Sequence, residues 1–128
     1  KGTQGPAQAF QLAARYPENA LILAHWGGGL PFYELMPEVR RALSNVYYDT
    51  AASHYLYEDS IFRHVMAWAP SKVLLGTDYP LVSQKRYLKR LRAAGLDESA
   101  LARVLSGSAL TVLRLTLTLP SPDSGRGK

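Results

Sequence analysis

Three short strand-like runs, which begin about 25 residues apart, constrain the fold of this chain more than any other feature of its sequence. They read ALILA at 20–24, NVYYD at 45–49 and KVLLG at 72–76. Their length and their aliphatic, aromatic and β-branched residues predict β-strands. The first run contains no polar residue, so we expect a strand that is buried on both faces, as in a parallel sheet.

Segments with the apolar spacing of an amphipathic helix precede, separate and follow the three runs. They predict helices over 6–16, 31–43 with a break at Pro37, 57–68, about 83–94 and about 98–105. Strand and helix therefore alternate. This alternation predicts an α/β fold of about three βα units, with a parallel sheet and right-handed crossovers.

The C-terminal residues differ in character from the rest of the chain. The LTLTL stretch at 115–119 alternates like an edge strand, although an exposed segment of this kind equally favours aggregation. From Pro120 onward, Pro, Ser, Gly and basic residues dominate, which predicts disorder. We therefore expect one folded domain over 1–115 and a disordered basic tail over 116–128.

Composition narrows the chemistry and the partners. The 128 residues include no cysteine, so any metal must be held by histidine, carboxylate or water. The net charge of +5 does not predict a nucleic-acid partner, because the basic residues are scattered or lie on the solvated face of the 83–94 helix and in the tail. No apolar stretch is long enough for a membrane span and no secretion signal is recognisable, so we expect a cytoplasmic protein without a membrane partner.

Two of the predicted strands end on residues that could carry chemistry. His25 follows the first strand and leads through Trp26 into three glycines, which permit backbone conformations that a Cβ would block. Asp78 follows the third strand in the sequence GTDYP. Because ligands of parallel sheets gather at the carboxyl ends of the strands, we expect both side chains at one edge, two strands apart.

Each candidate also has a purely structural interpretation. His25 could do no more than hydrogen-bond a neighbouring loop, and Asp78 could form a turn or cap a helix. The triple glycine lacks the spacing of a dinucleotide or Walker loop. The joint placement of the two residues favours function. Asp49, which ends the second run, is a third candidate that could instead cap its own loop.

Other residues near the expected site receive secondary roles. We expect Trp26, Tyr33 and Tyr79 to line the pocket, although aromatic residues at such places often serve packing. His54 follows the second strand and is expected at the surface, from which it could reach the pocket mouth. His64 lies within a helix and is expected to be structural or to face solvent.

The ordered stretches LILAHWGGGLPFYELMP, NVYYDTAAS and VLLGTDYPL resemble the last three strands of the amidohydrolase-related family. These are metal-dependent hydrolases and decarboxylases built on a distorted TIM barrel, and the resemblance runs from about residue 6 to about residue 113. It implies that the chain is the C-terminal part of a (β/α)8 barrel. It also implies that His25 is a catalytic group beside the metal or a ligand, and that Asp78 touches the metal and takes a proton from the nucleophilic water.

The resemblance therefore implies a divalent metal, zinc or manganese, and a small-molecule substrate. The reaction would be attack of water on the carbon of an amide, ester or related group, or decarboxylation. The chain departs from the family pattern, because its histidines are His25, His54 and His64, with no His-x-His pair. It also shows three strands where a closed barrel needs eight. We accordingly expect an incomplete C-terminal fragment, completed by the missing N-terminal half or by a homo-oligomer.

Two alternatives belong to other functional classes. The chain could be a non-catalytic remnant or interaction module, whose unpaired sheet edges would drive association. It could also bind a phosphorylated ligand at the glycine turn. The latter is disfavoured, because the glycines lead into Leu30 and Pro31 rather than into a capped helix.

Overall fold

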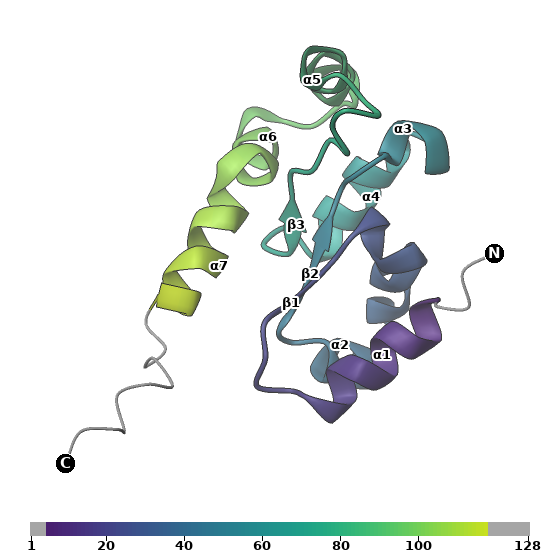
Figure 1. Cartoon of the computed structure of the whole chain (residues 1–128), viewed down its shortest axis with the longest axis vertical. Helices are drawn as coiled ribbons and strands as arrows, with labels where there is room; N and C mark the ends of the chain where they lie inside the picture. The colour runs from purple at the N-terminus through teal and green to yellow at the C-terminus, as the bar shows by residue number, and fades with distance from the viewer. Residues whose placement is uncertain (1–4, 118–128) are drawn as a thin grey trace.

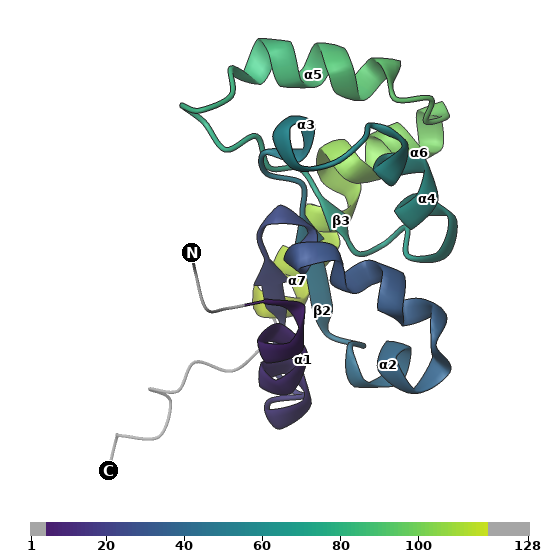
Figure 2. The same ribbon diagram turned by 90° about the vertical axis from the view of Figure 1, so that its right-hand side faces the viewer.

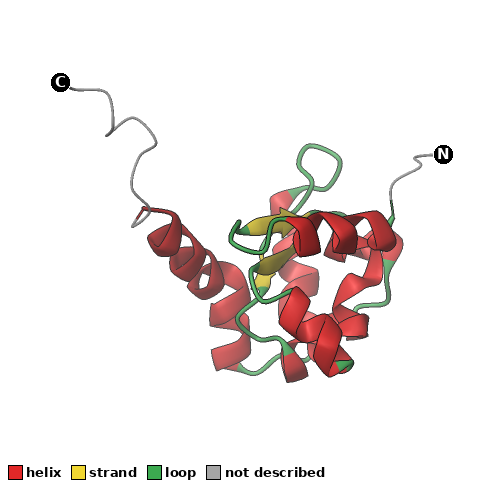
Figure 3. Ribbon diagram, turned by 90° about the horizontal axis from the view of Figure 1, so that it is seen from below, coloured by secondary structure: helices red, strands yellow, loops and turns green. Residues whose placement is uncertain are grey.

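A three-stranded parallel sheet forms the centre of the computed structural model, which describes residues 5–117 (Figures 1 and 3). Its strands are β1 (Leu21–Leu23), β2 (Val46–Asp49) and β3 (Val73–Leu74), in the order β1-β2-β3. Ile22 pairs with Tyr47, and Tyr48 with Val73. The predicted α/β class, with about three βα units on a parallel sheet, is confirmed.

Helical segments surround the sheet. They are α1 (Pro6–Arg15), η1 (His25–Leu35), α2 (Pro37–Ala42), α3 (Ser53–Leu56), α4 (Ser60–Trp68), α5 (Gln84–Ala93), α6 (Glu98–Ala102), η2 (Arg103–Gly107) and α7 (Ser108–Leu117). The predicted break at Pro37 is present, since η1 ends before that proline and α2 begins on it. The helix predicted over 57–68 is shorter, because Tyr57 is extended and α4 begins only at Ser60.

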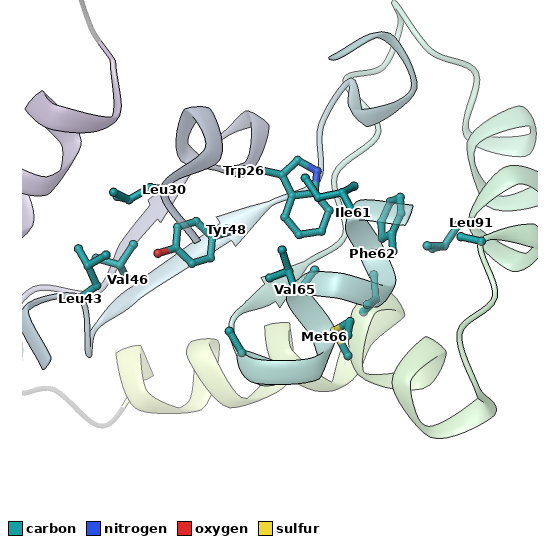
Figure 4. Packing of buried hydrophobic residues seen from close by; sticks show 14 of the residues in the cluster. Trp26, Leu30, Leu43, Val46, Tyr48, Ile61, Phe62, Val65, Met66 and Leu91 are labelled. Carbon is teal, nitrogen blue, oxygen red and sulfur yellow. The ribbon is translucent and has the colours of Figure 1, made fainter. Parts of the chain in front are cut away.

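The main hydrophobic core lies on the face of the sheet that α4 covers. Tyr48 and Val73 point into it from the strands, and Phe62 and Val65 from α4. Figure 4 shows Trp26 of η1 among the α4 side chains, with Leu91 of α5 approaching from beyond Phe62. The apolar spacing of α4 thus fills the space between the sheet and the outer helices.

The opposite face of the sheet is only partly covered. Val112 of α7 packs on Tyr47 and Leu74, and α4 and α7 lie on opposite sides of β3 (Figure 1). Ile22 of β1 is 54% exposed, so the prediction that this strand is buried on both faces is wrong. The physical reason is that β1 is an edge strand and the packing that α7 provides is confined to β2 and β3.

A buried ion pair links η1 to the residue that precedes β3, and sequence reasoning did not anticipate it. Lys72 Nζ donates to both carboxylate oxygens of Glu34 at 2.9 Å and to the carbonyl of Leu43 at 2.6 Å. Tyr48 donates its hydroxyl to Glu34 Oε1 at 2.5 Å. Glu34 is 2% exposed, so these bonds replace its hydration.

The C-terminal helices run on from one another as α6, η2 and α7. Because α7 continues through Leu117, the edge-strand interpretation of LTLTL is wrong for 115–117. The remainder of the predicted tail, 118–128, lies outside the described residues.

Within residues 5–117, no helix is long and apolar enough to cross a membrane.

Candidate functional site

Within residues 5–117, four residues other than glycine adopt a left-handed backbone conformation, and all four follow the carboxyl ends of strands. They are His25 and Trp26 after β1 (φ 55° and 56°), Ala52 after β2 (φ 53°) and Asp78 after β3 (φ 64°). Each such residue costs about 1–2 kcal/mol. Both predicted site residues therefore lie in strained loops at the carboxyl end of the sheet, with β2 between the strands that they follow.

The three glycines extend the same left-handed turn. Gly27, Gly28 and Gly29 have φ of 56°, 68° and 91°, so five consecutive residues from His25 onward have positive φ. Glycine adopts this conformation without a steric penalty. The glycines thus turn the chain directly after β1 and keep His25 at the carboxyl end of the sheet.

The His25 side chain is exposed and is fixed at one nitrogen. Its Nδ1 lies 3.0 Å from the carbonyl oxygen of Ala51, which follows β2. Since a carbonyl only accepts hydrogen bonds, Nδ1 must be the donor, and the neutral ring then has an unprotonated Nε2. That nitrogen can accept a proton or bind a metal ion. Tyr57 also donates its hydroxyl to the backbone carbonyl of His25 at 3.4 Å.

The Asp78 carboxylate is half-buried. The backbone carbonyl of Asp78 accepts the Val82 N–H at 3.2 Å, and this bond closes the turn that carries the Asp78 side chain. Within residues 5–117, the carboxylate oxygens of Asp78 have no hydrogen-bond or ion-pair partner in the structure. They are therefore available to a metal ion, a proton or a donor group on a ligand.

The end of β2 lies between these two residues and contacts both of their loops. Asp49 accepts the backbone N–H of Ala51 at 2.5 Å, so the predicted capping alternative for Asp49 describes its contact correctly. Thr50 donates its hydroxyl to the Gly76 carbonyl at 3.0 Å and accepts the Gly76 N–H at 3.1 Å. Sequence reasoning missed Thr50; the available signal was a polar residue directly after a buried strand.

Trp26 serves packing rather than lining a pocket. It is fully buried, donates its indole N–H to Ser53 Oγ at 2.7 Å, and meets Phe62 edge to face with ring centroids 5.3 Å apart. Tyr33 and Tyr79 are exposed. Tyr33 lines a separate apolar groove of about 500 Å³ between α1 and η1, so it does not share the edge that carries His25.

The expectation that His54 lies at the surface is wrong. Its side chain is 5% exposed, and Nδ1 lies 3.1 Å from Asp59 Oδ1. Its ring packs on Tyr87 of α5 with centroids 4.4 Å apart, because the short helix α3 turns it inward. The same Asp59 accepts two hydrogen bonds from Arg90 at 3.0 Å. His64 is exposed on α4, as predicted.

Residues 5–117 do not form a metal site by themselves. No group of three or more histidine, aspartate or glutamate side chains within 5–117 is arranged to hold an ion. His25 Nε2 and the Asp78 carboxylate fit the chemistry of such a site as two donors.

An open groove adjoins His25 along the free edge of β1. It has a volume of about 640 Å³ and runs between α1 and β1, with lining residues that include Leu12, Ile22, Ala24 and Gly28. Since β1 is an edge strand, this groove is the side on which the sheet can be extended.

Comparison with known proteins identifies relatives of this arrangement. Residues 4–115 match the profile of a family described as Amidohydrolase. A search of curated proteins finds no match.

Three solved structures share the fold. They are a 5-carboxyvanillate decarboxylase from Sphingomonas paucimobilis (18% identity, TM-score 0.69), a dihydroxybenzoic acid decarboxylase from Polaromonas sp. JS666 with bound manganese and the inhibitor 2-nitroresorcinol (17%, 0.68), and a 2,6-dihydroxybenzoate decarboxylase complexed with 2,6-dihydroxybenzoate (16%, 0.69). The matches cover 84%, 87% and 87% of this chain but 39%, 40% and 41% of the others. The chain thus spans about two fifths of these TIM barrels and corresponds to part of one.

Proposed function

The chain belongs to the amidohydrolase family, and we propose that His25 and Asp78 are its contribution to a divalent-metal catalytic site that the rest of a barrel completes. One observation carries this proposal. His25, which follows β1, and Asp78, which follows β3, are both held in left-handed loops at the carboxyl end of the sheet. The Nδ1 of His25 is bound to the Ala51 carbonyl, which leaves Nε2 free, and the carboxylate oxygens of Asp78 have no partner within residues 5–117. Strain of this kind is concentrated at functional sites.

The two side chains have distinct roles in the proposal. When bound, a divalent ion supplies Lewis acidity at the carboxyl edge of the sheet. Asp78 contributes carboxylate oxygens to that ion and accepts a proton from the reacting water, as its partial burial and free oxygens allow. His25 exchanges a proton with the substrate through Nε2, while its Nδ1 stays bound to Ala51.

We favour two reactions on a small molecule. The family description favours hydrolysis of an amide, ester or related carbon. The three similar structures are decarboxylases, which favours removal of a carboxylate group from the substrate. One of them has bound manganese, which favours manganese rather than zinc as the metal. Both reactions use a metal ion beside a carboxylate and an imidazole, so one site serves as the starting point for either assay.

Completion of the site requires a partner for the open edge of β1. The groove between α1 and β1 adjoins His25, and Ile22 exposes an apolar side chain on the uncovered face of the sheet. We propose that the remaining part of a barrel, or a second copy of this chain, occupies this edge. The alternative of a non-catalytic interaction module predicts the same association without any metal dependence. The cytoplasmic location expected from the sequence stays a prediction.

Calorimetric titration with Mn²⁺ and Zn²⁺ tests the metal site. We expect weak binding by the folded chain, because two donors do not complete a metal site. Binding should be lost in Asp78→Ala and reduced in His25→Ala. The matched control is Glu98→Gln, which removes an exposed carboxylate from α6. Equal binding by all four proteins would overturn the assignment.

A further inference from the structure

We propose that Thr50 is a positioning residue that holds the loops of His25 and Asp78 in place together. Thr50 follows β2, the middle strand, and is fully buried. Its strand lies between those that precede His25 and Asp78. The next residue, Ala51, contacts the His25 ring, and Thr50 itself contacts Gly76 in the loop of Asp78.

On one side, the hydroxyl of Thr50 fixes the loop of Asp78. It donates to the Gly76 carbonyl at 3.0 Å and accepts the Gly76 N–H at 3.1 Å, so it satisfies both polar groups of that backbone position. The Thr50 N–H also donates to the Leu74 carbonyl at 3.0 Å. Gly76 stands two residues before Asp78, so these bonds set where the chain leaves β3 and enters the left-handed turn.

On the other side, Thr50 begins the turn that holds His25. Its carbonyl accepts the Ser53 N–H at 3.2 Å, the Ser53 hydroxyl at 2.5 Å and the Tyr87 hydroxyl at 2.6 Å. These bonds fix the turn in which the next residue, Ala51, presents its carbonyl to His25 Nδ1. Ser53 Oγ also accepts the indole N–H of Trp26, which anchors the residue that follows His25.

All the polar groups of Thr50 are therefore engaged, and none faces the edge where a substrate would bind. Such a residue acts through the positions of others. Two consequences follow for the loops. The ring of His25 is held with Nδ1 protonated and Nε2 free, and the backbone at Gly76 is protected from exchange with solvent.

The test compares Thr50→Val, which removes the hydroxyl and keeps the branched shape, with Thr50→Ser, which keeps the hydroxyl. The control is Thr111→Val, since the Thr111 hydroxyl bonds the Gly107 carbonyl in the C-terminal helix. Nitrogen NMR reports which nitrogen of the neutral His25 ring carries the proton, and amide hydrogen exchange reports protection at Gly76.

Loss of the Thr50 hydroxyl in Thr50→Val should accelerate exchange at Gly76 by about tenfold, as expected for one lost hydrogen bond. It should leave His25 Nδ1-protonated, because the bonds that fix the turn beside His25 use the Thr50 backbone carbonyl, which valine keeps. Thr50→Ser and Thr111→Val should match the unaltered protein. A folded Thr50→Val protein with unchanged exchange at Gly76 would overturn the inference, and so would a Thr50→Ser protein that behaves like Thr50→Val.

If Thr50→Val does not fold, the unaltered protein and Thr50→Ser still decide the matter. Both must show an Nδ1-protonated His25 and a slowly exchanging Gly76 amide, and an Nε2-protonated ring in either protein contradicts the inference. The inference rests on the proposed function for the roles of His25 and Asp78. Its readouts need no metal ion, so its failure is distinguishable from a failure of the metal titrations.

Discussion

Gly76 lies so close to the carboxylate of Asp49 that no side chain fits between them. A Cβ added to Gly76 would stand 2.6 Å from Cγ and from Oδ2 of Asp49, well inside van der Waals contact. Asp49 is itself tied to the backbone N–H of Ala51 and cannot swing away without breaking that bond. The glycine of GTDYP thus lets β3 approach the end of β2 at the candidate site.

Gly76→Ala should therefore destabilise the fold by about 1–3 kcal/mol, the usual cost of overpacking. Urea denaturation measures this loss. The double variant Asp49→Ala/Gly76→Ala should lose less than the sum of the two single variants, because the clash is then absent. Additive losses would show that the two residues do not meet.

The left-handed turn after β1 gives a second prediction. Gly29→Ala should cost about 1–2 kcal/mol, because φ at Gly29 is 91° although the nearest atom to an added Cβ is 4.0 Å away. Gly107→Ala is the matched control, since Gly107 lies in a helix with no contact to an added Cβ closer than 3.5 Å. That variant should be neutral or more stable by about 1 kcal/mol. Equal effects in thermal or urea unfolding would contradict the backbone argument.

The buried ion pair between Lys72 and Glu34 gives a third prediction. Lys72→Met leaves the buried Glu34 carboxylate without its cation and should cost about 3 kcal/mol in urea unfolding. Adding Glu34→Gln should recover much of that loss, because no charge then stays buried. Lys85→Met, on the exposed face of α5, should change stability by less than about 0.5 kcal/mol. A Lys72→Met protein as stable as Lys85→Met would show that the pair is not formed.

The buried hydroxyl of Tyr48 should make the free energy of unfolding depend on pH in the alkaline range. Burial raises the pKa of Tyr48 far above its ordinary value of 10.0, and the hydrogen bond to Glu34 and the negative charge of that residue raise it further. The unfolded chain therefore ionises Tyr48 at a pH where the folded protein keeps it protonated. This contribution is complete below about pH 10 and declines above it by about 1.4 kcal/mol per pH unit.

Urea unfolding at several pH values between about 8 and about 11 measures this decline. Tyr48→Phe should lower stability throughout, because a hydrogen bond is lost, but should decline less steeply above about pH 10. Tyr55→Phe removes an exposed hydroxyl and should leave the slope unchanged. Identical slopes in all three proteins would contradict the assignment.

The positions of His25 and Asp78 could be predicted, because they depend only on where strands end and on the parallel order of those strands. The contacts of Thr50 could not, since its partner Gly76 is 26 residues away and pairs with it only after the sheet has formed. The burial of His54 was missed for a similar reason: α5, on a distant segment, covers it. The exposure of Ile22 follows from its edge position, which an apolar run does not reveal.

The central claim is that His25 and Asp78 together receive a divalent ion, and Mn²⁺ tests it directly by NMR. Because Mn²⁺ is paramagnetic, it broadens the signals of nearby nuclei even when it binds weakly. We predict selective broadening of the amide signals around His25, Gly76 and Asp78 at low Mn²⁺ concentrations. The broadening should be abolished in Asp78→Asn and retained in Glu98→Gln. Broadening centred on other carboxylates, or unchanged in Asp78→Asn, would contradict the account.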